Sequence, residues 1–169
     1  MDAGAAEHLR TANLALEYAK RHTELAEDVV LILDDITSLT RALNSCGGAV
    51  TAALGASALD GAKRFLAAAR NAEEGGSLTI VSALSAGEGD PVNGAIYSGL
   101  KDTGNMHITL LPQQALDIFR SSAAGQERLL SESEINAAFA LRQNYSAEQI
   151  LQLFKETTSN GEICARLDK

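Results

Sequence analysis

Five apolar residues followed by two carboxylates, residues 29–35 (VVLILDD), constrain the fold more than any other segment. A continuous apolar run of this length is typical of a strand buried on both faces of a parallel sheet. Open parallel sheets bind ligands at the carboxyl ends of their strands, and this strand ends in Asp34 and Asp35. Nucleotide-hydrolysing proteins present an aspartate there to a phosphate-bound magnesium ion, so Asp34 is the primary candidate for a magnesium-side carboxylate. Asp35 is expected to cap the following helix.

Strand and helix patterns alternate through the first two thirds of the chain. Helices are expected over residues 5–26, 37–44 and 92–101 and from an N-cap at Ser57, and strands over residues 29–34, 78–84 and 106–111. The alternation predicts an α/β fold with right-handed crossovers and a mainly parallel sheet. An α+β domain with mixed strands is the alternative.

The last third of the chain reads as helices. Ser131-x-x-Glu134 and Ser146-x-x-Gln149 are both capping-box patterns that precede apolar-periodic segments. Asn160-Gly161 is expected to end the last helix. No linker-like composition separates these helices from the rest, so residues 1–169 are expected to form a single domain.

Composition and charge exclude some classes of function. The net charge of −8 argues against broad nucleic-acid binding through a basic face. Cys46 and Cys164 lie far apart in the sequence, without partners at metal-ligand spacing, and are expected to be reduced thiols. The N-terminus lacks a signal-peptide pattern and no window resembles a membrane span, so a cytoplasmic protein without membrane contact is expected.

A phosphate-binding loop is missing from the sequence. A Walker A loop needs Gly-x-x-x-x-Gly-Lys followed by Ser or Thr, and no lysine here follows a glycine. Glycines do cluster at three places, Gly47-Gly48, Gly75-Gly76 and Gly87-x-Gly89. None of these has the spacing that phosphate binding requires, so turns are the preferred interpretation.

Several segments together resemble the C-terminal half of the ATPase domain of the bacterial transcription termination factor Rho family. They are residues 28–44 (DVVLILDDITSLTRALN), 58–83 (ALDGAKRFLAAARNAEEGGSLTIVSA), 96–97 (IY) and 100–106 (LKDTGNM). The resemblance implies a three-layer RecA-like fold of the P-loop NTPase type, here a partial domain with a mainly parallel sheet and C-terminal helices. Rho-family proteins are homohexameric ATPases that translocate along RNA and release transcripts from RNA polymerase.

The resemblance also implies roles for particular residues. Asp34 looks like the Walker B aspartate that acts on magnesium-bound ATP, and Phe119 matches an aromatic residue near the adenine. Two loops match those that enter the central channel and touch RNA. They contain Gly47, Gly48, Ala49 and Val50 in the first loop, and Gly87, Glu88 and Gly89 in the second.

The chain departs from the family pattern at several of its functional positions. Gly48 and Pro91 stand where the family has lysines that grip RNA, and Ser38 replaces an arginine. The family's arginine-finger segment corresponds to residues 120–126 (RSSAAGQ), with Ala124 or Gly125 at the finger position. The family's RNA-binding module and Walker A half would lie before residue 1.

These departures leave two hypotheses open. The chain is either part of a Rho-type termination factor that hydrolyses ATP, or a non-catalytic Rho-like binding or regulatory module that acts through a protein interface. Loss of an arginine finger alone lowers turnover by about 10³–10⁵. The chain by itself is therefore expected to lack ATPase activity, to hold neither ATP nor Mg²⁺, and to bind RNA weakly or not at all.

Overall fold

The computed structural model describes residues 4–47, 54–85, 89–111 and 116–167. The chain divides into two compact units, Met1–Gly104 and Asn105–Lys169. The first unit contains the helices α1 (Ala5–Glu24), α2 (Ile36–Cys46), α3 (Ala56–Leu66) and α4 (Pro91–Leu100), with the strands β1 (Val29–Leu33), β2 (Arg70–Asn71) and β3 (Ser77–Ser82). In the part of the chain that is described, no helix is long and apolar enough to cross a membrane.

The sheet of the first unit is mixed, with the order β1-β3-β2. β1 and β3 pair in parallel from Val29 opposite Leu78 to Leu33 opposite Ser82, which fits the expected crossover. β2 is a two-residue antiparallel strand beside the start of β3, and it was not predicted. Gly76 sits in the tight connection between β2 and β3, where its N–H donates to the Thr23 carbonyl oxygen over 2.9 Å.

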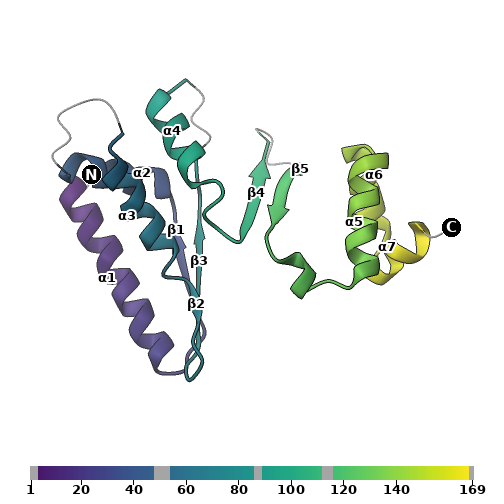
Figure 1. The fold of residues 1–169 in the computed structure, drawn as a ribbon, viewed down its shortest axis with the longest axis horizontal. Helices are drawn as coiled ribbons and strands as arrows, with labels where there is room; N and C mark the ends of the chain where they lie inside the picture. Colours follow the sequence, from purple (N-terminus) through teal and green to yellow (C-terminus); the bar gives the residue numbers. More distant parts are fainter. Residues whose placement is uncertain (1–3, 48–53, 86–88, 112–115, 168–169) are drawn as a thin grey trace. The chain divides into compact units, whose positions relative to one another are not determined.

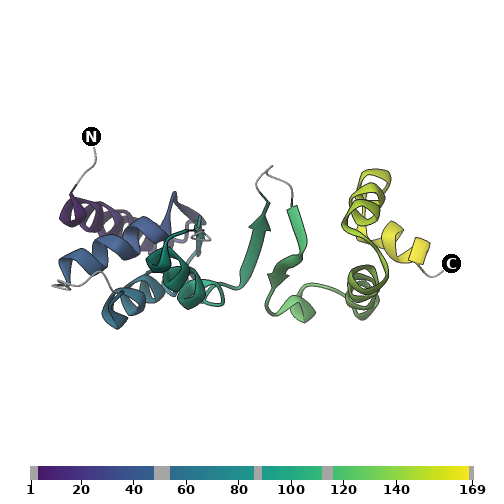
Figure 2. The ribbon, with the colours of Figure 1, turned by 90° about the horizontal axis from the view of Figure 1, so that it is seen from above.

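One face of this sheet packs against the helices. α1, α2 and α3 lie on the same side of the strands (Figures 1 and 2). Their apolar stripes, with one from α4, enclose a core of buried residues, namely Ala12, Leu16, Ala19, Ile36, Leu39, Ala62, Phe65, Ala68, Leu78, Ile96 and Leu100. Val29, Leu31 and Leu33 of β1 pack against this core.

The prediction that β1 is buried on both faces is wrong for this chain. Val30 and Ile32 on its other face are 62% and 75% exposed, and Val81 of β3 is 52% exposed. The alternation of side chains along a strand sends these residues away from the helices. No described element of the first unit covers them, so within this unit a sequence typical of an interior strand forms a half-exposed one.

The second unit holds a hairpin and three helices. Its elements are β4 (Met106–Leu110), β5 (Leu116–Ala123), a 3₁₀ turn η1 (Gln126–Arg128), α5 (Glu132–Asn144), α6 (Ala147–Glu156) and α7 (Asn160–Leu167). The strand expected over residues 106–111 exists, but it pairs antiparallel with β5 and not with the parallel strands. Ile118, Leu141 and Ile150 form the small core of this unit.

Capping explains where the helices of the second unit begin. Both predicted capping boxes are present, at Ser131 with Glu134 and at Ser146 with Gln149. The expectation that Asn160-Gly161 ends the last helix is wrong, because Asn160 begins α7. The Ser159 hydroxyl accepts a hydrogen bond from the Glu162 N–H over 3.3 Å, so residues 159–162 repeat the same Ser-x-x-Glu pattern.

The start of α3 also differs from the sequence prediction. Gly55 precedes the first residue of the helix, whereas Ser57 was expected to be the N-cap. The Gly55 N–H donates to Oδ1 of Asn44 over 2.8 Å, which attaches the start of α3 to the last turn of α2. This long-range hydrogen bond fixes the boundary, and a local pattern cannot reveal it.

Candidate functional site

Asp34 lies where the parallel strands β1 and β3 end together. The Ala83 N–H donates to the Leu33 carbonyl oxygen over 3.3 Å, and the Ile36 N–H donates to the Ala83 carbonyl oxygen over 3.0 Å. These two bonds extend the ladder past both strand ends and hold the intervening Asp34 at the carboxyl edge of the sheet. Its side chain is exposed. The position is the one at which open α/β sheets bind ligands.

Asp35 caps α2, as the sequence predicts. Its carboxylate accepts from the Thr37 N–H over 2.8 Å, from the Ser38 N–H over 3.3 Å and from the Ser38 hydroxyl over 2.8 Å. Burial by itself would raise the pKa of the carboxyl, but the hydrogen bonds from Ser38 and Thr37 outweigh it and hold the pKa below its ordinary value of 3.8. Asp35 is thus committed to the helix N-terminus, which leaves Asp34 as the carboxylate available to a ligand.

We expect Asp35→Ala to destabilise the protein by about 1 kcal/mol, because the Thr37 and Ser38 N–H groups at the start of α2 would lose their hydrogen-bond acceptor. Because the folded-state pKa is lowered, this stabilisation is fully present above pH 3.8 and is lost as the pH falls below that value through the folded-state pKa. Urea unfolding of both proteins at several pH values measures the difference. Asp35→Asn is the matched control, because asparagine also caps helices but cannot ionise. A stability difference for the alanine variant that persists unchanged at pH 2 would contradict the assignment.

A second cluster of polar contacts ties α4 to α2. The Arg41 guanidinium donates to the Asp90 carboxylate and, over 2.8 Å, to Oδ1 of Asn93. Asp90 in turn caps α4 by accepting from the Val92 N–H over 2.9 Å. The Val92 N–H and, beyond it, Arg41 stabilise the anion, so the pKa of Asp90 lies below its ordinary value.

α2 also contacts the chain just after β3. The Ser85 N–H donates to the Thr37 hydroxyl over 3.0 Å, so α2 contacts Ser85 as well as Asp90. Sequence reasoning missed both contacts. Asp90-Pro91 carried a signal, because Asp at the N-cap followed by Pro at the first helical position is a strong helix start. The pairing of Asp90 with Arg41 had no signal, since 49 residues separate them.

The residues predicted from the channel loops are only partly described. Gly48, Ala49, Val50, Gly87 and Glu88 lie outside the described residues. Gly89 directly precedes Asp90 and has a φ of 82°, a left-handed conformation that favours glycine. Gly47 follows the last residue of α2, an 11-residue helix, so it lies about 16 Å from the Asp35 end of that helix.

Phe119 belongs to the second unit. It lies on β5 with half of its surface exposed, and its N–H donates to Oδ1 of Asp117 over 3.1 Å. Arg120, the one arginine in the segment that matches the arginine finger, is largely exposed and lies 3.7 Å from the Asp117 carboxylate. Neither candidate finger position provides a cation, because alanine and glycine at 124 and 125 carry no charged group. Gly125 adopts a left-handed φ of 70°.

The described residues do not fit a magnesium nucleotide by themselves. They contain no group of three or more His, Cys, Asp or Glu side chains placed to hold a metal ion. Asp34 supplies one carboxylate, and its neighbour Asp35 is occupied by the α2 cap. A nucleotide would need phosphate-binding donors from elsewhere, because the sequence has no Walker A loop.

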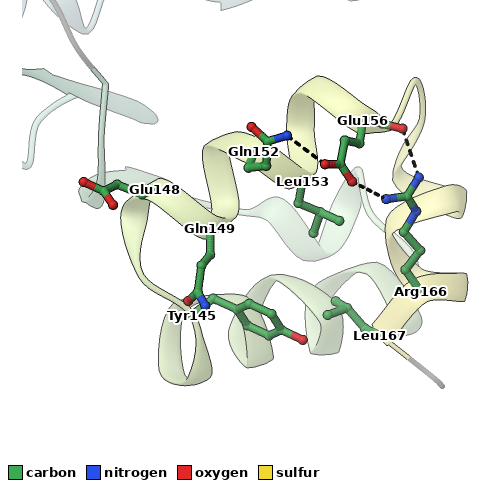
Figure 3. A pocket seen from close by; sticks show the side chains of 8 residues that line it. All are labelled: Tyr145, Glu148, Gln149, Gln152, Leu153, Glu156, Arg166 and Leu167. Carbon is green, nitrogen blue, oxygen red and sulfur yellow. Dashed lines mark hydrogen bonds and ion pairs between the residues drawn. The ribbon is translucent and has the colours of Figure 1, made fainter.

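A separate hollow lies between α6 and α7 in the second unit (Figure 3). In its lining, the Glu156 carboxylate accepts from Arg166 over 2.9 Å and from Gln152 over 2.7 Å. Tyr145, Leu153 and Leu167 provide the apolar lining. The hollow contains none of the site residues that the sequence predicts.

Comparison with known proteins decides the relationship. The chain is 38% identical to "Transcription termination factor Rho" of Pseudomonas aeruginosa over 92% of its length, and 35% identical to that of Streptomyces lividans over 99% of its length. This chain is a relative of transcription termination factor Rho. The recognition made from the sequence is thereby confirmed. No family model matches the chain.

Solved structures place the chain in the RecA-like class of α/β folds. A prototypical ATPase of the type III secretion system of pathogenic bacteria superposes with a TM-score of 0.70 over 83% of this chain, at 24% identity. EscN, the type III secretion ATPase of enteropathogenic E. coli, gives a TM-score of 0.65 over 90% of the chain, at 21% identity. These likenesses confirm the predicted fold class and concern the fold alone.

The Rho-like chain spans only part of its relatives. It covers 42% of the Pseudomonas aeruginosa protein, 26% of the Streptomyces lividans protein and 44% of the chain of the prototypical secretion ATPase. What those longer proteins do as a whole is therefore a matter of proposal for this chain.

Proposed function

We propose that the chain acts in Rho-type transcription termination as a region that supplies a Walker B-type aspartate, Asp34, and that it does not hydrolyse ATP by itself. The observation that carries the proposal is the position of Asp34 at the joint carboxyl end of β1 and β3, in a chain similar to Rho over most of its length. That position lets a carboxylate act on a magnesium ion bound to a triphosphate held by other residues.

The proposal assigns ATP and Mg²⁺ to a larger assembly. Phosphate binding needs a backbone cradle and a lysine, and both must come from residues outside this sequence. RNA contacts are expected to be weak, since Gly48 and Pro91 replace lysines of the family pattern and the net charge is −8. Homohexamer formation, RNA polymerase as a partner and a cytoplasmic location remain predictions.

We expect the isolated chain to show no RNA-stimulated ATP hydrolysis, because it lacks a triphosphate-binding loop. A coupled phosphate-release assay with and without RNA measures this, and titration calorimetry should give a dissociation constant for Mg-ATP weaker than about 1 mM. Asp34→Asn is the matched control and should give the same baseline. Turnover by the wild-type chain that disappears in Asp34→Asn would overturn the proposed inactivity.

A second candidate is a non-catalytic Rho-like module that regulates through a protein interface. The simultaneous loss of both channel-loop lysines and the finger arginine supports it, because the absence of a Walker A half alone does not require those changes. The mass of the native polypeptide, measured by immunoblotting and mass spectrometry, separates the two candidates. A native protein that contains a Walker A motif supports the first, and one that lacks it supports the second.

A further inference from the structure

We propose that Asp90 suppresses RNA binding by this chain, because its carboxylate neutralises Arg41, the one cationic side chain in the two sequence ranges that contain the channel-loop matches. The proposal rests on the proposed function, which assigns weak RNA contacts to this chain, and it names a residue that weakens them. The contact that carries it joins Arg41 of α2 to Asp90 at the start of α4, and both residues belong to the first unit.

The distribution of basic residues along the chain singles out Arg41. It is the only lysine or arginine in residues 22–62, and residues 71–100 contain neither. The first of these ranges includes the loop match at residues 47–50, and the second includes the match at residues 87–89. RNA binding depends on lysine and arginine side chains that neutralise phosphates. Within these two ranges, a charged contact to a phosphate therefore depends on Arg41.

The guanidinium of Arg41 is engaged by two residues of the α4 start. One of its terminal nitrogens donates to the Asp90 carboxylate, and its Nε–H donates to Oδ1 of Asn93 over 2.8 Å. A guanidinium binds a phosphate through the same N–H donors that it presents to a carboxylate. Asp90 and an RNA phosphate thus compete for one group, and Asp90 has the advantage because it belongs to the same chain.

The cap of α4 holds the Asp90 carboxylate beside Arg41. Oδ1 of Asp90 accepts from the Val92 N–H over 2.9 Å and from the Asn93 N–H over 3.4 Å, while Oδ2 accepts from Arg41. Pro91 at the first helical position favours the same helix start. One carboxylate therefore serves the helix with one oxygen and the guanidinium with the other.

The contact between Arg41 and Asp90 has little weight in folding. The two side chains are 43% and 41% exposed, and exposed ion pairs contribute little to stability. The same exposure leaves the Arg41 guanidinium in contact with solvent. Removing the charge of Asp90 should therefore change RNA binding more than it changes folding.

Asp90→Asn tests the proposal, because asparagine also caps helices but carries no charge. At low ionic strength the variant should bind fluorescein-labelled oligo(U) RNA at least about threefold more tightly than wild type, measured by fluorescence anisotropy. One added phosphate contact should steepen the slope of log K against log salt by about 0.7. Asp90→Ser, which also keeps a helix cap, should give the same gain.

A double-mutant cycle identifies Arg41 as the group that is released. Arg41→Gln should cancel the gain in the Asp90→Asn background but hardly change RNA binding of the wild-type chain, where Asp90 already neutralises the guanidinium. Such non-additivity is not expected if Asp90 acts only through the net charge of the protein.

Glu74→Gln is the matched control for net charge. Glu74 is exposed in the turn before β3, so the variant loses one negative charge and should bind RNA like wild type. Circular dichroism and thermal unfolding of Asp90→Asn should match those of wild type. The proposal is overturned if Asp90→Asn binds RNA like wild type, if Glu74→Gln gives the same gain, or if the gain survives Arg41→Gln. ATP hydrolysis by the wild-type chain would overturn the proposed function and leave this result unaffected.

Discussion

Replacing Gly76 with alanine is expected to destabilise the protein by about 3 kcal/mol, at the upper end of what overpacking usually costs. A Cβ atom at this position would lie 1.9 Å from the Glu27 carbonyl oxygen and 2.3 Å from the Glu27 carbonyl carbon. Both are backbone atoms directly before β1, so no side-chain rotation can relieve the clash. The β2–β3 connection would have to move away from the segment that leads into β1.

Urea unfolding followed by circular dichroism measures the loss for Gly76→Ala. Gly94→Ala is the matched control, because Gly94 lies inside α4 and a Cβ there meets no atom within 4 Å. Alanine at that position should raise the stability by up to about 1 kcal/mol, since it favours the helix over the unfolded chain. Equal effects of the two substitutions would show that the close approach of Gly76 to Glu27 is not a constraint on the fold.

Ile150→Ala is expected to destabilise the second unit by about 2–5 kcal/mol. Ile150 is 1% exposed and, among the described residues, shares its core with two other buried ones, Ile118 and Leu141. Removing its side chain therefore takes away a large part of the buried apolar surface that holds α6 against β5 and the neighbouring helices. The loss should increase hydrogen exchange throughout α5 and α6.

Phe139→Ala provides the comparison for Ile150→Ala. Phe139 is a larger side chain on α5 but is 63% exposed, so its removal should change stability by less than about 0.5 kcal/mol. Hydrogen exchange and urea unfolding of both variants measure the contrast. An effect of Phe139→Ala as large as that of Ile150→Ala would mean that the core of the second unit is not the one described.

Local sequence patterns predicted the helix starts that depend on hydrogen bonds between residues close together in the chain. Asp35 caps α2 because its carboxylate reaches amides two and three residues along the chain, and the boxes at Ser131 and Ser146 work in the same way. Each of these capping interactions spans four residues or fewer. The aspartate that follows the apolar strand was also visible in the sequence, because it does not depend on how the strands pair.

Longer-range interactions decided the elements that the sequence did not reveal. β2 exists because Arg70 and Asn71 pair with Leu78 and Ser77, and β5 because it pairs with β4. The register shift between His107 and Thr109 places extra residues in β5, so burial along β5 does not alternate simply. The Arg41–Asp90 contact likewise requires the folded chain to bring α2 and α4 together.

The sequence by itself determined that residues 29–33 form an apolar strand followed by Asp34, that Asp35 caps the next helix, and that the chain is related to Rho. Only the tertiary structure decided how much of that strand is buried. The same five apolar residues suit a strand covered on one face or on both, because burial depends on which elements reach each face. Here the helices reach one face, and Val30 and Ile32 on the other remain exposed.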